Sequence, residues 1–158
     1  MTKLAHVRSY KELNVYRKAR ALAKDIFELT KTFPREERFA LTDQVRRSSR
    51  SIGAQIAEAW AKRRYEKHFI SKLTDADGEQ LETQHWLGVA FDCGYLDSST
   101  ERQLTARCEE IGRMLASMMA KATLFCNPDA LSAFREPAPS YHTATDLADF
   151  FIDPETEY

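Results

Sequence analysis

The sequence predicts an all-α fold, an antiparallel up-down-up-down four-helix bundle formed by one domain. Four long stretches carry apolar residues at alternating spacings of three and four, which is the period of one helix face. Short turns separate these stretches, so consecutive helices should be antiparallel neighbours. Five Gly and five Pro are few for 158 residues, and no strand-like alternation interrupts the helical patterns.

The first expected helix spans about residues 10–32 and the second about residues 36–64. Pro34 ends the first helix, because proline cannot continue a helix. Acidic residues at the start of the second helix and basic residues at its end suit the helix dipole. Its expected buried stripe consists of Leu41, Val45, Ser49, Ile52, Ile56 and Ala59 with Trp60.

The third expected helix spans about residues 66–93 and closes at Gly94, a residue type that commonly follows a helix C-terminus. Gly78 and Gly88 lie inside it and each costs about 1 kcal/mol relative to alanine, which a closely approaching helix would explain. Its expected buried stripe is Phe69, Leu73, Ala76, Gln80, Leu87 and Phe91.

The fourth expected helix begins after Ser98 and Ser99, which are favourable N-cap residues. It continues to the Asn127-Pro128 pair, where proline stops it. Its buried stripe is expected to comprise Leu104, Cys108, Ile111, Leu115, Met118, Ala122 and Phe125. The bundle therefore occupies residues 10–126.

Residues 127–158 should form an acidic, partly flexible tail, because they carry one basic residue against seven acidic ones together with four prolines. Within the tail, residues 146–152 suggest a short docking helix with Leu147, Phe150 and Phe151 on one face. This helix could pack on its own bundle, or it could enter a basic groove of a neighbouring subunit or another protein. We favour docking within a homo-oligomer.

The formal net charge of −1 conceals a strong asymmetry. Residues 1–64 carry 16 Lys and Arg against 7 Asp and Glu, whereas residues 65–158 carry 7 against 17. Such an asymmetry predicts a basic surface contributed by the first half of the chain. The candidate nucleic-acid-binding residues in this half and just beyond it are Arg46, Arg47, Arg50, Lys62, Arg63, Arg64 and Lys67.

These cations can attract phosphates by Coulomb attraction and counterion release, and the neighbouring Tyr65 could stack on a base. The alternative is a solvated face whose cations pair with acidic residues of the third helix. Glu79 and Glu82 in particular could pair with Arg46, Arg47 or Arg50 and set the register of the second and third helices. The sequence leaves both interpretations open.

Catalytic motifs are missing from the chain, which has no nucleophile elbow and no phosphate-binding loop. Glu82 and His85 match a single E-x-x-H ligand step of di-iron bundles, but no second step exists. We therefore expect no metal, no cofactor and no enzymatic activity. Three cysteines without metal-ligand spacing, and no signal or membrane-spanning run, predict a cytoplasmic protein without membrane contact.

Three segments carry the pattern of a known family. They are Leu13–Thr32 with Phe33-Pro34; Leu41 to Ile52 with Gln44, Arg46-Arg47 and Ile56-Ala57-Glu58; and Gly78 to Glu82 with Gly94-Tyr95-Leu96. Together they span about residues 10–125 and resemble the small four-helix bundle proteins of 23S rRNA intervening sequences. The family usually has Asn and Gly where this chain has Gln55 and Ala59, so the second helix should continue more regularly here.

The resemblance implies a bundle that assembles into a ring, commonly a homopentamer. It extends to the accessory variability protein of diversity-generating retroelements, a pentameric bundle that binds nucleic acid and its partner reverse transcriptase. We therefore expect an oligomeric scaffold for RNA or DNA, with itself, nucleic acid, and a reverse transcriptase or another protein as partners. The alternative is a protein–protein adaptor whose charge asymmetry serves ring assembly and partner docking.

Overall fold

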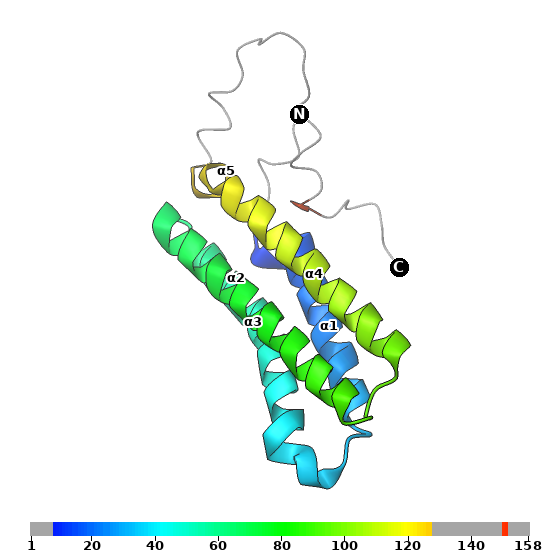
Figure 1. Ribbon diagram of the computed structural model, residues 1–158. Helices are drawn as coiled ribbons and strands as arrows, with labels where there is room; N and C mark the ends of the chain where they lie inside the picture. Colours follow the sequence, from blue (N-terminus) through cyan, green and yellow to red (C-terminus); the bar gives the residue numbers. More distant parts are fainter. Residues whose placement is uncertain (1–7, 128–149, 152–158) are drawn as a thin grey trace.

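Four long helices form the body of the protein in the computed structural model, which describes residues 8–127 and 150–151 (Figure 1). Consecutive helices run antiparallel and pack against each other, and α1 also packs against α4. The expected all-α four-helix bundle is therefore confirmed. The helices are α1 (Asn14–Thr30), α2 (Asp43–Lys62), α3 (Glu66–Asp92), α4 (Ser98–Ala120) and the short α5 (Ala122–Cys126).

The first two helices begin later than the apolar pattern suggested. A 3-10 turn, Tyr10–Glu12, precedes α1, and Leu13 between them has extended backbone with φ −74° and ψ 127°. The expected start of the second helix consists of a 3-10 turn, Arg35–Glu37, and a π-helical turn, Arg38–Thr42. These residues therefore form short turns of different pitch rather than one continuous helix. From Asp43 onward α2 is regular, as expected.

The end of α3 follows the sequence prediction. Gly94 has φ +78°, a conformation that favours glycine. The Tyr95 N–H donates to the Ala90 carbonyl at 2.9 Å, and the Gly94 N–H donates to the Phe91 carbonyl at 2.9 Å. These are the two hydrogen bonds of a Schellman motif, so Gly94 closes the helix by satisfying carbonyls that have no partner within it.

The N-cap of α4 is Asp97, and the expectation that Ser98 and Ser99 provide it is wrong. The Asp97 carboxylate accepts a hydrogen bond from the Thr100 N–H at 2.7 Å, and this bond lowers the pKa of Asp97. The helix also ends earlier than expected. Lys121 leaves helical geometry with φ −109° and ψ 24°, and α5 continues beyond it.

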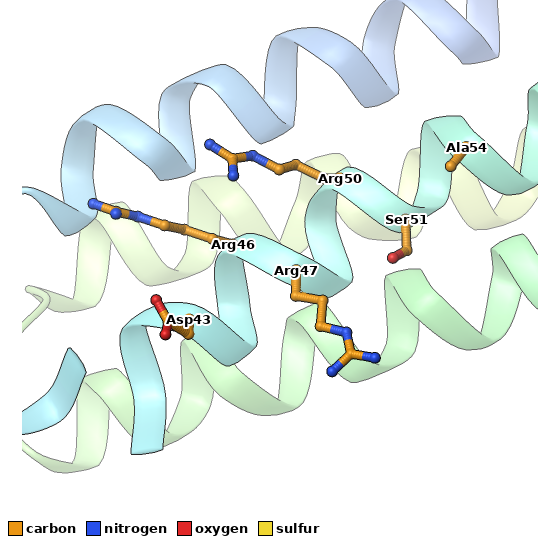
Figure 2. Close-up of a pocket in the computed structure, with 6 residues that line it drawn as sticks. All are labelled: Asp43, Arg46, Arg47, Arg50, Ser51 and Ala54. Carbon is orange, nitrogen blue, oxygen red and sulfur yellow. The ribbon is translucent and has the colours of Figure 1, made fainter. Parts of the chain in front are cut away.

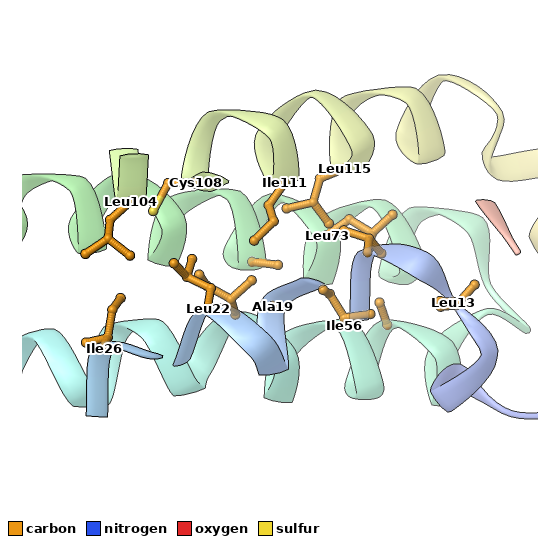
Figure 3. Packing of buried hydrophobic residues seen from close by; sticks show 14 of the residues in the cluster. Leu13, Ala19, Leu22, Ile26, Ile56, Leu73, Leu104, Cys108, Ile111 and Leu115 are labelled. Carbon is orange, nitrogen blue, oxygen red and sulfur yellow. The ribbon is translucent and has the colours of Figure 1, made fainter. Parts of the chain in front are cut away.

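The core runs along the centre of the bundle (Figure 3) and contains the predicted stripes of α2 and α4. Every predicted position of the fourth stretch is buried, from Leu104 in α4 to Phe125 in α5, and in the second stretch only Trp60 remains partly exposed. In α3 the expectation is wrong for Phe91, which is 42% exposed. The buried stripe continues from Leu87 to Ala90 instead, because the buried positions of α3 alternate at spacings of four and three residues and Ala90, not Phe91, lies on that repeat.

The two cysteines of the fourth stretch have different surroundings. Cys108 is fully buried in the core, and burial raises the pKa of its thiol to about 12. Cys126 is half-buried, and burial raises its pKa as well. Cys108 therefore serves as a small apolar side chain and not as a nucleophile.

A neighbouring helix approaches closely at Gly112, and not at Gly78 or Gly88, the two glycines that the sequence analysis identified. A Cβ atom at Gly78 or Gly88 would have no neighbour within 4 Å, so the expected close contact at these positions is wrong. A Cβ atom at Gly112 of α4 would instead lie 2.8 Å from Nε2 of Gln80 on α3. Gln80 is only 4% exposed, and its Nε2 donates to Asp77 at 2.9 Å.

We predict that alanine has opposite effects at two of these glycines. Gly112→Ala should lower the free energy of unfolding by about 1 kcal/mol, because displacing the buried Gln80 side chain outweighs the gain in helix propensity. Gly78→Ala should raise it by about 0.5–1 kcal/mol, because nothing obstructs the new methyl group. Urea titrations followed by circular dichroism measure both. A shift in the same direction for both variants would contradict the packing of α3 on α4.

Two tail residues complete one end of the bundle. Phe150 is buried, with its ring edge-on to that of Phe125 at 5.5 Å between centroids. Phe151 forms an isolated antiparallel bridge with Leu13, and its carbonyl accepts a hydrogen bond from the Asn14 side chain at 3.1 Å. In the described residues, these two side chains therefore pack on their own bundle. The rest of the expected docking helix at 146–152 lies outside the described residues.

Candidate nucleic-acid interface

The seven candidate cations form two groups at opposite ends of α2. Arg46, Arg47 and Arg50 lie in the first half of the helix, and we call them the helix cluster. Lys62, Arg63, Arg64 and Lys67 lie where α2 turns into α3, and we call them the corner cluster. Sixteen residues of helix separate Arg46 from Lys62, which corresponds to about 24 Å. The structure therefore brings together the members of each group but not the two groups.

Arg46 and Arg50 reach from α2 toward α1 (Figure 2). The Arg46 Nε donates to the Thr30 hydroxyl at 2.7 Å, and its Cζ lies 4.8 Å from the centre of the Phe27 ring. The Arg50 Cζ lies 5.3 Å from the same ring. Arg46 is half-buried by these contacts whereas Arg50 is exposed. Arg46 therefore ties α2 to α1, and Arg50 keeps its charge in the solvent.

Arg47 points the opposite way, toward α3 (Figure 2). Burial and the neighbouring Glu82 carboxylate raise the pKa of Glu79 on α3, and the Arg47 charge offsets part of that rise. Glu82 accepts a hydrogen bond from the Trp86 indole at 3.1 Å instead of binding an arginine. The expected ion pairs between these glutamates and the helix cluster are not formed in the described part of the chain, where none of the three arginines lies within 4.0 Å of a carboxylate.

The helix cluster surrounds an open depression on the outer surface of α2. It has a volume of about 550 Å³ and is lined by Asp43, Arg46, Arg47, Arg50, Ser51 and Ala54. Asp43 is the only carboxylate among the described residues that line it, and the three arginines therefore make the net charge of this lining positive. Three guanidinium groups around an open surface can donate to the oxygens of a phosphate from more than one direction.

The corner cluster combines cations with exposed aromatic rings. Arg63 donates to the Trp60 carbonyl at 2.6 Å and stacks over the Trp60 ring at 4.2 Å, so it stabilises the C-terminus of α2. Tyr65 is 58% exposed, and the Arg64 Cζ lies 5.7 Å from its ring centre. Lys62, Arg64 and Lys67 remain exposed. This corner can contact phosphates and offer a ring for stacking.

The ion pairs of the described residues lie elsewhere on the bundle. Lys18 binds Glu110 at 3.0 Å, and Arg107 binds Asp25 at 2.6 Å across the α1–α4 surface. Lys72 binds Glu58 at 2.9 Å, which lowers the pKa of Glu58. None of the seven candidate cations takes part in such a pair within residues 8–127 and 150–151. Their charge is therefore not neutralised by a direct ion pair, although Arg47 acts on Glu79 and Lys62 on Glu58 over a longer distance.

The sequence analysis missed two basic residues beside the helix cluster. Arg20 and Lys24 of α1 line a second hollow that shares Arg50 with the depression. Both are exposed. Their spacing of four residues, which places them on one face of α1, was the available signal.

The remaining sequence predictions concern the environment of His85, metal binding and membrane-spanning helices. The His85 ring packs edge-on to Trp86 at 4.8 Å between centroids. Across the described ranges, no group of three or more His, Cys, Asp or Glu side chains has the geometry to hold a metal ion. In the same ranges, every helix is too short or too polar for a membrane span.

Comparisons with known proteins agree with the geometry of the bundle. The model of a family described as 23S rRNA-intervening sequence protein matches residues 11–117. The chain is 31% identical to a protein with unknown function from the S23 ribosomal protein family of Bacteroides thetaiotaomicron VPI-5482, which has a crystal structure at 1.70 Å resolution. The similarity covers 67% of this chain and 95% of that one, with a TM-score of 0.61. No curated protein matches the chain.

Proposed function

The chain belongs to the 23S rRNA-intervening sequence protein family, and we propose that it is a non-enzymatic, homo-oligomeric scaffold that binds RNA or DNA through the phosphate backbone. The single observation that carries this proposal is the set of seven cations without a carboxylate partner in the described part of the chain. Cations without a direct ion pair on one helix and its following turn create a positive potential that attracts a polyanion. A homo-oligomer would repeat this surface in every subunit.

The seven cations would have two different roles, stiffening of the surface and contact with phosphates. Arg46 and Arg63 are held by Thr30 and by Trp60, so they would mainly stiffen the surface. Arg47, Arg50 and the exposed cations of the corner cluster would contact phosphates. Contacts to phosphates position a nucleic acid but do not read its bases, so we expect little sequence preference.

A charge reversal at the two exposed arginines tests the proposal. The variant Arg47→Glu/Arg50→Glu should bind a fluorescein-labelled 20-nucleotide single strand and a labelled 20-base-pair duplex at least tenfold more weakly than the parent protein, because two phosphate contacts become repulsive. Fluorescence anisotropy at fixed salt measures the affinities. The helical circular dichroism spectrum should not change, because both side chains are exposed.

A second charge reversal provides the matched control. The variant Lys18→Glu/Arg107→Glu alters the net charge by the same amount on the α1–α4 surface, where both cations form exposed ion pairs. Its affinities should stay within about threefold of the parent's, because it affects only long-range attraction. Unchanged affinity of the α2 variant, or an equal loss in the control, would contradict the proposal.

One observation favours the adaptor as a second candidate function. Two large apolar side chains of α3 are exposed in the described residues, with Leu81 55% and Phe91 42% exposed, and Gly78 and Gly88 beside them are open to approach. Such exposed side chains suit contact with another protein, including a second copy of this chain. Under this alternative, the charge reversal on α2 changes the sedimentation coefficient of the protein and not its affinity for nucleic acid.

A further inference from the structure

A groove between α1 and α2 lies directly beside the helix cluster. It has a volume of about 480 Å³ and shares Arg50 and Ala54 with the depression. Its floor is open because small side chains line it, namely Ala19, Ala23, Gly53, Ala54 and Ala57. A Cβ atom at Gly53 would lie 3.6 Å from the Tyr16 ring. Glycine at this position therefore leaves the space next to the ring empty.

The walls of the groove are cationic. Arg20 and Lys24 come from α1 and Arg50 from α2, and none of the described residues that line the groove is acidic. None of the three cations lies within 4.0 Å of a carboxylate in the portion that the structure describes. The groove therefore favours an anionic occupant by charge complementarity.

Aromatic rings stand at intervals along the same groove. Tyr10 and Tyr16 meet edge to face with 4.8 Å between centroids, and Phe27 lies farther along α1. Both tyrosines are half-buried and so remain partly accessible. Basic side chains that follow a backbone and aromatic rings that accept bases are the two features by which proteins hold unpaired nucleic acid.

The dimensions of the groove favour a single strand over a duplex. It lies between two packed helices, whose axes in such contacts are about 8–10 Å apart, so a duplex would contact only the rims. Arg20 and Lys24 are separated by about 6 Å along the helix axis. Stacked strands place phosphates about 3.4 Å apart along the duplex axis, so this wider spacing suits an extended strand.

We propose that the α1–α2 groove binds a single-stranded segment of nucleic acid, with its phosphates at Arg20, Lys24 and Arg50 and a base against the Tyr10–Tyr16 pair. This inference rests on the proposed function and adds to it the class of nucleic acid and a path on the surface. The depression and the groove then form one continuous track, because Arg50 and Ala54 line both.

The experiment compares a labelled 20-nucleotide oligothymidine with a labelled 20-base-pair duplex on the full-length protein, by fluorescence anisotropy at fixed salt. Arg20→Gln/Lys24→Gln should weaken single-strand binding about tenfold and duplex binding less than threefold. Tyr16→Leu, which keeps an apolar side chain but removes the ring, should weaken single-strand binding about fivefold or more. Ala57→Phe, which fills the groove without changing its charge, should act in the same direction.

Lys18→Gln/Arg107→Gln is the matched control, because it removes two cations of the bundle outside the groove and should change neither affinity more than twofold. Circular dichroism and sedimentation of each variant report its fold and mass. Equal losses for single strand and duplex, or no loss with Tyr16→Leu and Ala57→Phe, would overturn the inference. A change in mass without loss of single-strand binding would assign the groove to a second copy of the chain, which also overturns it.

The failure of this inference can be distinguished from the failure of the proposed function. If the parent protein binds both probes, and Arg47→Glu/Arg50→Glu weakens binding while the groove variants do not, the phosphate-binding function stands and the groove is excluded. If the parent protein binds neither probe, both proposals are wrong.

Discussion

Replacing Leu73 by alanine should lower the free energy of unfolding by about 3 kcal/mol. Leu73 has no exposed surface and lies in the first third of α3, among buried residues of the other helices (Figure 3). Truncating such a side chain loses its transfer free energy and leaves a cavity, which costs about 2–5 kcal/mol in total. Equilibrium unfolding in urea, followed by circular dichroism at constant protein concentration, measures the difference.

Leu81→Ala is the matched control for this prediction, because it makes the same chemical change on the same helix. Leu81 is 55% exposed, so its truncation should cost less than about 1 kcal/mol. A loss below 1 kcal/mol for Leu73→Ala would contradict the core as described. An equally large loss for Leu81→Ala would contradict an uncovered outer face on α3.

Phe150→Ala should lower the free energy of unfolding by about 2 kcal/mol. Phe150 is 5% exposed and packs edge-on against Phe125, and Lys121 lies 5.6 Å from its ring centre. Truncation of a buried Phe typically costs about 3–5 kcal/mol, but a segment near the end of the chain can detach, which limits the loss. The same urea titration measures it.

Phe39→Ala is the control for the second prediction. Phe39 is 72% exposed on the π-helical turn, where Arg38 lies over its ring, so its truncation should change stability by less than about 0.5 kcal/mol. If Phe150→Ala also costs less than 0.5 kcal/mol, the tail does not stabilise the bundle and the packing on Phe125 is wrong.

Apolar periodicity predicted the bundle well because burial repeats with the turn of the helix. The stripe from Leu104 in α4 to Phe125 in α5 is buried at every predicted position, and Gly94 closes α3 as expected. The errors arise where contacts between helices decide the outcome. Gly112 matters only because Gln80 lies across from it, and neither residue reveals this contact in the sequence.

The candidate site was predictable in its residues but not in their roles. The density of arginines on α2 identified the helix cluster. Arg46 binds Thr30 and Arg47 faces α3 because of the way in which α1, α2 and α3 pack against each other. The sequence pattern of a single helix does not contain this information. The α1–α2 groove was missed for a similar reason, because periodicity marks buried side chains and not the surface gaps that alanine and glycine leave between two helices.

The dependence of nucleic-acid affinity on salt tests most directly the central claim that the unpaired cations of α2 bind phosphates. We predict that the logarithm of the association constant falls linearly with the logarithm of the salt concentration, and that Arg47→Glu/Arg50→Glu reduces the slope by about 2, because each phosphate contact contributes about 0.9. The sedimentation coefficient of the protein without nucleic acid should stay constant over the same series. An affinity that is insensitive to salt, together with an oligomer that dissociates as salt rises, would contradict the account.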